Sequence, residues 1–178
     1  MPLLVETTAA QVTCVAHLTI RLTTVRPVQF VDLTDELRAA VRRLRLAWGI
    51  VNVQTRHTTT GIVVNEHEPL LLSDMVGALD RYAPASADYR HDDMTERTVN
   101  VLPGGAERRN GHAHCQAALL RTSEGINVVD GALSLGRWQR VLFVELDGGQ
   151  TREVSVMIVG STEPRGQPGR GCLSASAR

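Results

Sequence analysis

The sequence predicts an α+β domain in which about three helices pack on a mostly antiparallel β-sheet or sandwich. Several segments alternate apolar and polar residues, as strands with one buried face do. Asp-Gly turns follow two of these segments and are typical of antiparallel hairpins, while other segments carry apolar stripes at helical spacing. The 178 residues suit one compact domain, which we place at residues 1–160. We expect residues 161–178, rich in glycine, proline, serine and arginine, to form a disordered tail.

The first elements are a strand and a helix. Residues 12–23 alternate as a half-buried strand does, with His17 on the solvent face. Residues 27–31 are extended, and Asp32 or Thr34 then caps a helix that we expect to reach about Trp48, before Gly49 stops it. Its apolar stripe consists of Leu33, Leu37, Val41, Leu44 and Trp48.

The middle of the chain contains two strands, a helix and a long irregular segment. Residues 50–54 and 61–65 are strand-like, and the HTTT run lies either between them or within one long bent strand. Pro69 begins a helix that reaches about Tyr82. Residues 84–107 form an irregular segment, and loops of this length are usually functional or disordered.

The last elements begin at Asn110, which we expect to cap a short helix through about Leu120. Residues 125–129 form a strand that ends in the hairpin turn Asp130-Gly131. Residues 140–146 and 153–159 also alternate, and we expect Asp147-Gly148-Gly149 to join them as a second hairpin.

Composition excludes several classes of function. All nineteen basic residues are arginine, so a P-loop and a lysine Schiff base are excluded. The formal net charge is zero, which argues against nucleic-acid and membrane-surface partners. The N-terminus does not resemble a signal peptide, no apolar run could span a bilayer, and the odd number of cysteines does not suggest a disulfide framework. We therefore expect a cytoplasmic protein.

Histidines are the main candidates for chemistry. His57, His91 and His114 come from a strand, a loop and a helix start, and three neutral imidazoles could hold a divalent metal ion or act as an acid–base cluster. Spacing alone gives no metal motif, because the chain has neither HExxH nor paired CxxC. The alternative for each is a histidine satisfied by backbone groups in a polar pocket. His112 lies two residues before His114, so mid-helix geometry points the two apart.

Other residues could bind an anion or support the histidines. The helix start at Asn110 favours a phosphate, and Arg137 could donate to the same anion. Asn65 either holds a substrate or belongs to a turn at the end of a strand. Glu145 lies in an otherwise apolar strand, so its carboxylate needs a partner, for which we consider a histidine or Arg137. A serine hydrolase is disfavoured, because no GxSxG-type elbow is present.

The ordered motifs resemble the YjbQ family, also called the secondary thiamine-phosphate synthase family. The likeness covers about residues 12–160 and rests on His57-Thr58, Asn65-Glu66, Tyr89, His91, His114, Ser123, Gly131, Gly136, Trp138, Gln139 and Glu145. The sequence departs from the commoner pattern at Arg137, where many members have threonine, and at Asn110-Gly111-His112, where others have acidic residues and proline.

The resemblance implies a compact α+β protein that assembles as a homotrimer. It also implies a small enzyme that acts on a phosphorylated or anionic small molecule. The candidate activity is that of a thiamine-phosphate synthase, which joins a pyrimidine diphosphate to a thiazole phosphate. The expected site has His57, His91, His114 and Glu145 as catalytic residues, the three histidines holding a divalent metal ion such as zinc, and Asn65, Asn110 and Arg137 binding substrate. The alternative is a trimeric protein that binds an anionic metabolite without turnover.

Overall fold

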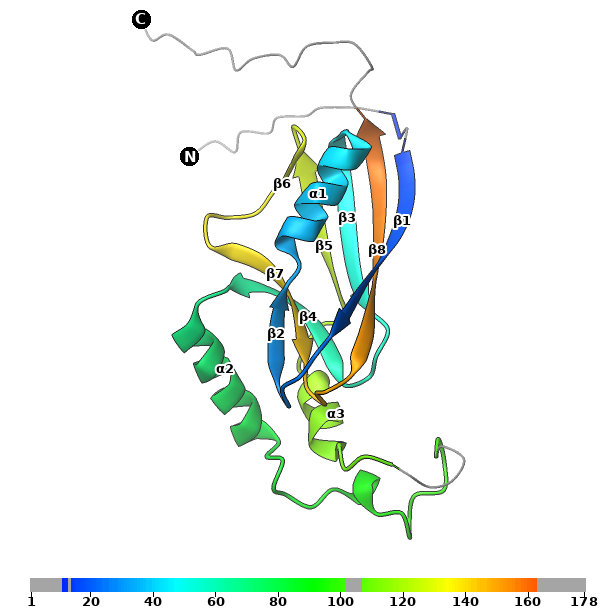
Figure 1. Cartoon of the computed structure of the whole chain (residues 1–178), viewed down its shortest axis with the longest axis vertical. Helices are drawn as coiled ribbons and strands as arrows, with labels where there is room; N and C mark the ends of the chain where they lie inside the picture. Colours follow the sequence, from blue (N-terminus) through cyan, green and yellow to red (C-terminus); the bar gives the residue numbers. More distant parts are fainter. Residues whose placement is uncertain (1–10, 13, 102–106, 163–178) are drawn as a thin grey trace, which may run out of the picture.

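Two antiparallel sheets make up the body of the protein in the computed structural model, which describes residues 11–12, 14–101 and 107–162 (Figure 1). The larger sheet has the strand order β1-β8-β3-β5-β6, and the smaller has the order β2-β7-β4. The strand bounds are β1 (Cys14–Thr23), β2 (Gln29–Asp32), β3 (Leu46–Thr55), β4 (Thr60–Glu66), β5 (Ser123–Val129), β6 (Ala132–Leu133), β7 (Gln139–Glu145) and β8 (Thr151–Thr162).

Helix α1 (Thr34–Leu44) and the smaller sheet cover one face of the larger sheet. The helix buries a stripe formed by Leu33 just before it and by Leu37 and Val41 within it, exposed by 2%, 0% and 1%. Each such side chain stabilises the fold by roughly 1.5–3 kcal/mol. The stripe joins one apolar core with the inner faces of both sheets. The α+β class predicted from the sequence is therefore confirmed.

The first predicted strand is confirmed as β1, which begins at Cys14, two residues later than predicted, and ends at Thr23 as predicted. The predicted helix begins at Thr34 as expected, but its predicted end is wrong. His17 lies on the exposed face of β1, where its Nε2 hydrogen-bonds Ser155 Oγ at 2.9 Å. The helix ends at Leu44, because Arg45 adopts a left-handed conformation with φ of 51°. Trp48 and Gly49 therefore belong to β3, where Gly49 pairs with Gly160. A Cβ at Gly49 would lie 2.3 Å from the carbonyl oxygen of Val159, so this position requires glycine.

Of the two predicted hairpins, the first forms and the second does not. Asp130 and Gly131, with φ of 49° and 78°, join β5 to β6 as a two-residue turn. The turn after Asp147 instead carries the chain from β7 in one sheet to β8 in the other. A Cβ at Gly148 would lie 1.5 Å from the Arg26 carbonyl oxygen, so the backbones of two turns meet there. The Asp-Gly-Gly signal predicts a reversal correctly but not which strands pair.

The HTTT run likewise connects the two sheets, because β3 and β4 belong to different ones. Helix α2 (Pro69–Tyr82) has the predicted bounds, and its first turn is capped by Glu68, whose carboxylate accepts from the N–H groups of Leu70 and Leu71. No helix in the described residues is long and apolar enough to cross a membrane.

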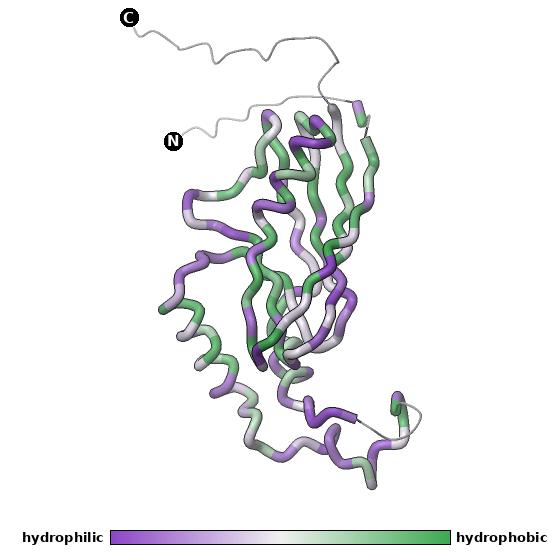
Figure 2. The backbone as a smooth tube through the Cα atoms, in the orientation of Figure 1, coloured by the Kyte–Doolittle hydropathy of each residue, from purple (hydrophilic) through white to green (hydrophobic). Residues whose placement is uncertain are grey.

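The described parts of the segment after α2 are irregular as predicted, apart from a short 3₁₀ turn η1 (Arg90–Asp92), and residues 107–110 lead to α3 (Gly111–Ala117). Helix α3 begins after Asn110, as expected, and ends three residues before the predicted Leu120. Strand β8 continues through Thr162, and the rest of the predicted tail lies outside the described residues. Figure 2 shows hydrophilic residues along η1 and the approach to α3, at the end of the molecule where the candidate site lies.

Candidate functional site

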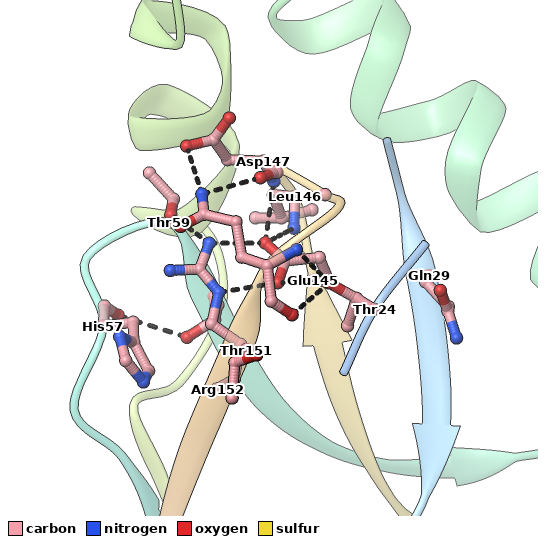
Figure 3. Close-up of polar contacts among 12 residues, drawn as sticks. Thr24, Gln29, His57, Thr59, Glu145, Leu146, Asp147, Thr151 and Arg152 are labelled. Carbon is pink, nitrogen blue, oxygen red and sulfur yellow. Dashed lines mark hydrogen bonds and ion pairs between the residues drawn. The ribbon is translucent and has the colours of Figure 1, made fainter. Parts of the chain in front are cut away.

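A buried ion pair between Glu145 and Arg152 lies at the centre of this end of the protein (Figure 3). Glu145 is the last residue of β7 and is fully buried, while Arg152 is the second residue of β8 and is 6% exposed. The Arg152 guanidinium donates from Nε to Oε2 and from Nη2 to Oε1, both at 2.7 Å. This two-bond geometry fixes both side chains.

Further donors complete the shell around the Glu145 carboxylate. The Thr24 hydroxyl donates to Oε2 at 3.1 Å, and the N–H groups of Leu146 and Asp147 donate to Oε1 at 3.1 and 2.9 Å. Burial alone would raise the pKa of Glu145, but Arg152 and these donors outweigh it and hold the pKa below its ordinary value. Glu145 is therefore an ionised carboxylate whose role is to hold Arg152.

His57 lies beside this ion pair and is held in one tautomer (Figure 3). The backbone N–H of Glu153 donates to His57 Nε2 at 3.1 Å, so Nε2 carries no proton and Nδ1 carries it in the neutral ring. Burial and the positive charge of Arg152 lower the pKa of His57, which favours that neutral ring. His57 thus offers an N–H donor at Nδ1, while its Nε2 lone pair is already used.

His91 and His114 form a second histidine site. Their ring centroids lie 4.5 Å apart, with the ring planes tilted by 57°. Gly111 permits this arrangement, because a Cβ there would come within 2.4 Å of the Tyr89 Cβ that precedes η1. Burial and the neighbouring His91 lower the pKa of His114, and Asp147 opposes them. A hollow of about 520 Å³ adjoins His91 and is also lined by Arg97.

Asp147 organises the polar groups between these sites. Its Oδ1 accepts from Arg108 Nε at 2.9 Å, and its Oδ2 accepts from Asn110 Nδ2 at 2.8 Å and from Gln150 Nε2 at 3.1 Å. The side chain of Asn110, predicted to help bind a phosphate, is thus engaged within the chain. The backbone N–H groups of Asn110 and Gly111 both donate to Asp92 Oδ1 at 2.9 Å, so a carboxylate of the chain already occupies the helix start.

Asn65 and Arg137 lie elsewhere. Asn65 pairs with Arg140 near the start of β7, and its side chain accepts from the N–H of Glu66. Arg137 precedes the same strand and stacks on the exposed Trp138, with the guanidinium carbon 4.9 Å from the ring centroid. The seven residues of β7 separate this end from Glu145 by roughly 20 Å at ~3.3 Å per residue. Arg137 therefore cannot share an anion with Asn110 of the same chain, and it is not the partner of Glu145.

The predicted three-histidine metal centre does not form inside one chain. Among the described residues, no three His, Cys, Asp or Glu side chains lie together in a way that could hold a metal ion. His57 is bound through Nε2 to the backbone of β8, whereas His91 and His114 contact each other. Two imidazoles fall short of the three protein ligands usual for a catalytic zinc ion.

Arg152 was missed in the sequence, although a signal for it was present. It shares its parity with Val154, Val156 and Ile158, so it lies on the buried face of β8. An arginine in register with a buried apolar face needs an anionic partner. Glu145, equally isolated in an apolar strand, is the complementary charge.

Comparison with known proteins places the fold and motifs in a family. The model of the family described as "UPF0047 protein YjbQ-like" matches residues 18–161. The chain belongs to the YjbQ family. A UPF0047 protein of Archaeoglobus fulgidus is 37% identical over 135 residues, which are 76% of this chain and 94% of the relative. One of Methanothermobacter thermautotrophicus is 34% identical over 139 residues, 78% of this chain and 88% of the relative.

Solved structures of YjbQ proteins agree with this fold. A YjbQ-like protein of unknown function from Sulfolobus solfataricus superposes with a TM-score of 0.74 at 29% identity, covering 85% of this chain and all of the other. A YjbQ/UPF0047 protein of Clostridium acetobutylicum gives a TM-score of 0.68 at 34% identity, covering 79% of this chain and 98% of the other. These similarities establish the family and the architecture of this YjbQ protein.

Proposed function

We propose that this YjbQ protein is a small enzyme that acts on a phosphorylated small molecule at the His91–His114 pair. The observation that carries the proposal is the contact of these two rings at 4.5 Å, beside a hollow of about 520 Å³. A volume of this size falls within the ~300–1,000 Å³ typical of small-molecule sites. His91 belongs to η1 and His114 to α3, so the two rings come from different elements and the fold must bring them together.

The pair is suited to proton transfer. Two positive charges this close repel each other, so His91 disfavours the charged form of His114. Since the pKa of His114 is lowered by burial and by His91, its neutral form is available as a general base near neutral pH. Arg97, 14% exposed and 3.6 Å from Glu107, supplies a nearby positive charge. Such a charge would stabilise a phosphate or diphosphate as it departs.

Family membership directs the first assay to thiamine-phosphate synthesis. In that reaction the thiazole nitrogen forms a bond to the pyrimidine methylene carbon, and the carbon–oxygen bond to pyrophosphate breaks. Within the part of the chain that the structure describes, the residues do not fit a three-histidine metal centre. We therefore assign no step to a metal ion, and charge stabilisation would come from arginine.

The test compares His114→Ala with His17→Ala in an assay of pyrimidine diphosphate and thiazole phosphate, followed by a panel of phosphate esters. His17 is a matched control, because it lies on the exposed face of β1, where its ring hydrogen-bonds the Ser155 hydroxyl and no residue of the candidate site. We expect His114→Ala to lose at least about a hundredfold in rate, the low end of acid–base contributions, with an unchanged circular dichroism spectrum. Equal rates for the two variants would reject the proposal, and tight binding without turnover would favour a binding protein.

We also propose that the chain assembles as a homotrimer. Two separate apolar surfaces support this. On α2 only Leu79 is buried, and Leu70 is 75% exposed. On the outer face of the larger sheet, Val15, Ile50 and Met157 are 70%, 42% and 39% exposed. Two different patches that cover each other between copies form a head-to-tail contact, and three such contacts make a closed ring when each copy is rotated by a third of a turn from the last.

A further inference from the structure

A second hollow, of about 260 Å³, lies at the turn between β7 and β8. Arg108, Arg109 and His112 line it, together with Asp147 and the glycines Gly148 and Gly149. Its volume is below the ~300–1,000 Å³ typical of whole-ligand sites, so it suits one end group of a ligand rather than a complete molecule. The side chains that line it indicate which group.

Arg108 is held in place for binding. Its Nε donates to Asp147 Oδ1 at 2.9 Å, and its Nη2 donates to the carbonyl oxygen of Gly148 at 2.8 Å. These bonds use two of the five guanidinium N–H groups, and the side chain remains 53% exposed. Arg108 therefore presents a fixed cation whose orientation is set by an 8%-exposed carboxylate.

Arg109 adds a second positive charge that is only weakly held. Its Nη2 lies 3.7 Å from Asp88 Oδ1, and both side chains are exposed. Such surface pairs are worth about 0–1 kcal/mol, so a ligand can readily displace Asp88. Arg109 can then turn toward an anion in the hollow without disturbing the fold.

His112 completes the lining and separates this hollow from the His91–His114 pair. It lies on α3 two residues before His114, and residues at that spacing project about 200° apart on a helix. Asp147 connects the two places, because it lines the hollow and its charge also reaches His114. A ligand end group held in the hollow would therefore lie across the start of α3 from the histidine pair.

The charge balance selects an anion. Among the described residues that line the hollow, Asp147 is the only acidic one, and it already accepts from Arg108, Asn110 and Gln150. Arg108 and Arg109 thus leave a net positive hollow. In a chain without lysine, arginine is the side chain that carries a permanent positive charge, and the guanidinium fork matches the oxygens of a phosphoryl group.

We propose that Arg108, Arg109 and His112 form a phosphoryl-binding subsite, oriented by Asp147, at the turn between β7 and β8. It deepens the proposed function, on which it rests for the assignment of the phosphoryl group to the substrate. It replaces the pairing of Asn110 with Arg137 that the sequence suggested. Arg109 is the residue to change, because it is exposed and its loss leaves the Arg108–Asp147 bond intact.

The test is isothermal titration calorimetry of the full chain with inorganic phosphate and with pyrophosphate, in a phosphate-free buffer of low ionic strength. Arg109→Gln is compared with Arg38→Gln, which removes the same charge from α1, where Arg38 pairs only with Asp35 among the described ion pairs. We expect Arg109→Gln to weaken binding at least about tenfold, as loss of one charge-assisted hydrogen bond does, and Arg38→Gln to leave it unchanged. Arg109→Lys should recover part of the loss.

Absence of saturable phosphate binding in the wild type, or equal affinities for the two variants, would overturn the subsite. The same titration on His114→Ala separates the two proposals, because phosphate binding requires no turnover. Phosphate binding that depends on Arg109 while no phosphate ester is turned over would support the subsite and reject the enzyme. Turnover that depends on His114 without Arg109-dependent phosphate binding would reject the subsite alone.

Discussion

The guanidinium of Arg152 donates to both carboxylate oxygens of Glu145 at 2.7 Å, inside a site where neither residue is more than 6% exposed. The pair joins the end of β7 to the start of β8, which belong to different sheets. It also positions His57, because the residue after Arg152 donates its backbone N–H to the imidazole. The two sheets and the candidate site are therefore fixed by the same ion pair.

Removing the positive charge of Arg152 while Glu145 stays in place should destabilise the fold. We expect Arg152→Met to lower the free energy of unfolding by about 3–5 kcal/mol, because it leaves the buried Glu145 carboxylate without its charge partner. Arg21→Met is the matched control, since Arg21 also bonds a glutamate, Glu153, but on the exposed surface, where such pairs contribute about 0–1 kcal/mol. Urea denaturation followed by circular dichroism measures both. Similar losses for the two variants would mean that the buried pair does not hold the sheets together.

The same carboxylate should make the fold sensitive to acid. The pKa of Glu145 is lowered in the folded state from its ordinary value of 4.5, so the unfolded chain binds more protons below that pH. The stability it contributes is complete above pH 4.5 and is lost as the pH falls through the folded-state pKa. Glu145→Gln should therefore reduce the dependence of unfolding free energy on pH below 4.5, measured by urea denaturation across that range. An unchanged pH dependence in this variant would show that other carboxyl groups dominate.

The sequence predicted the positions of the helices and strands better than it predicted which strands pair. Alternation located the strands and the buried face of β1, because it records which side chains avoid water. It does not record which strand lies alongside, so the turn at Asp147 was read as a hairpin although it changes sheets. Helix α1 was predicted too long, because Trp48 continues its apolar spacing four residues after Leu44 but pairs with Ser161 in β3 instead.

For the candidate site, too, the sequence predicted some residues and contacts but not others. The isolation of Glu145 in an apolar strand correctly indicated a buried carboxylate with a partner. Distance along the chain does not identify its partner, because Arg137 and Arg152 are similarly far from Glu145, and the signal that separates them is the position of Arg152 on the buried face of β8. His91 and His114 were expected to lie together and do, whereas His57 is held away from them by the β8 backbone.

The histidine geometry gives a sharp test of the predicted metal ion. We expect any zinc affinity of the chain to depend on His91 and His114 and not on His57, whose Nε2 lone pair already accepts a backbone N–H. Zinc binding should weaken at least about tenfold in His91→Ala and in His114→Ala, because each substitution removes one of the two imidazole ligands. His57→Ala is the matched control. Competition with a chelating dye measures the affinities, and an equal loss in His57→Ala would restore the three-histidine site.

Assembly should depend on the outer face of the larger sheet. Ile50, 42% exposed, pairs with Val159 across this face, and burying an arginine there without a partner would cost more than the contact gains. We expect the wild type to elute in light-scattering chromatography with three times the 19.4 kDa chain mass, and Ile50→Arg to elute as a monomer. Gln54→Arg is the matched control, because Gln54 is exposed on the same face of β3, where its neighbour on β8 is the polar Ser155. A trimer that survives Ile50→Arg would place the contact elsewhere, and a monomeric wild type would reject the assembly. Because α2 also packs against the helix that carries His114, loss of the trimer together with loss of activity would indicate that a neighbouring copy shapes the site.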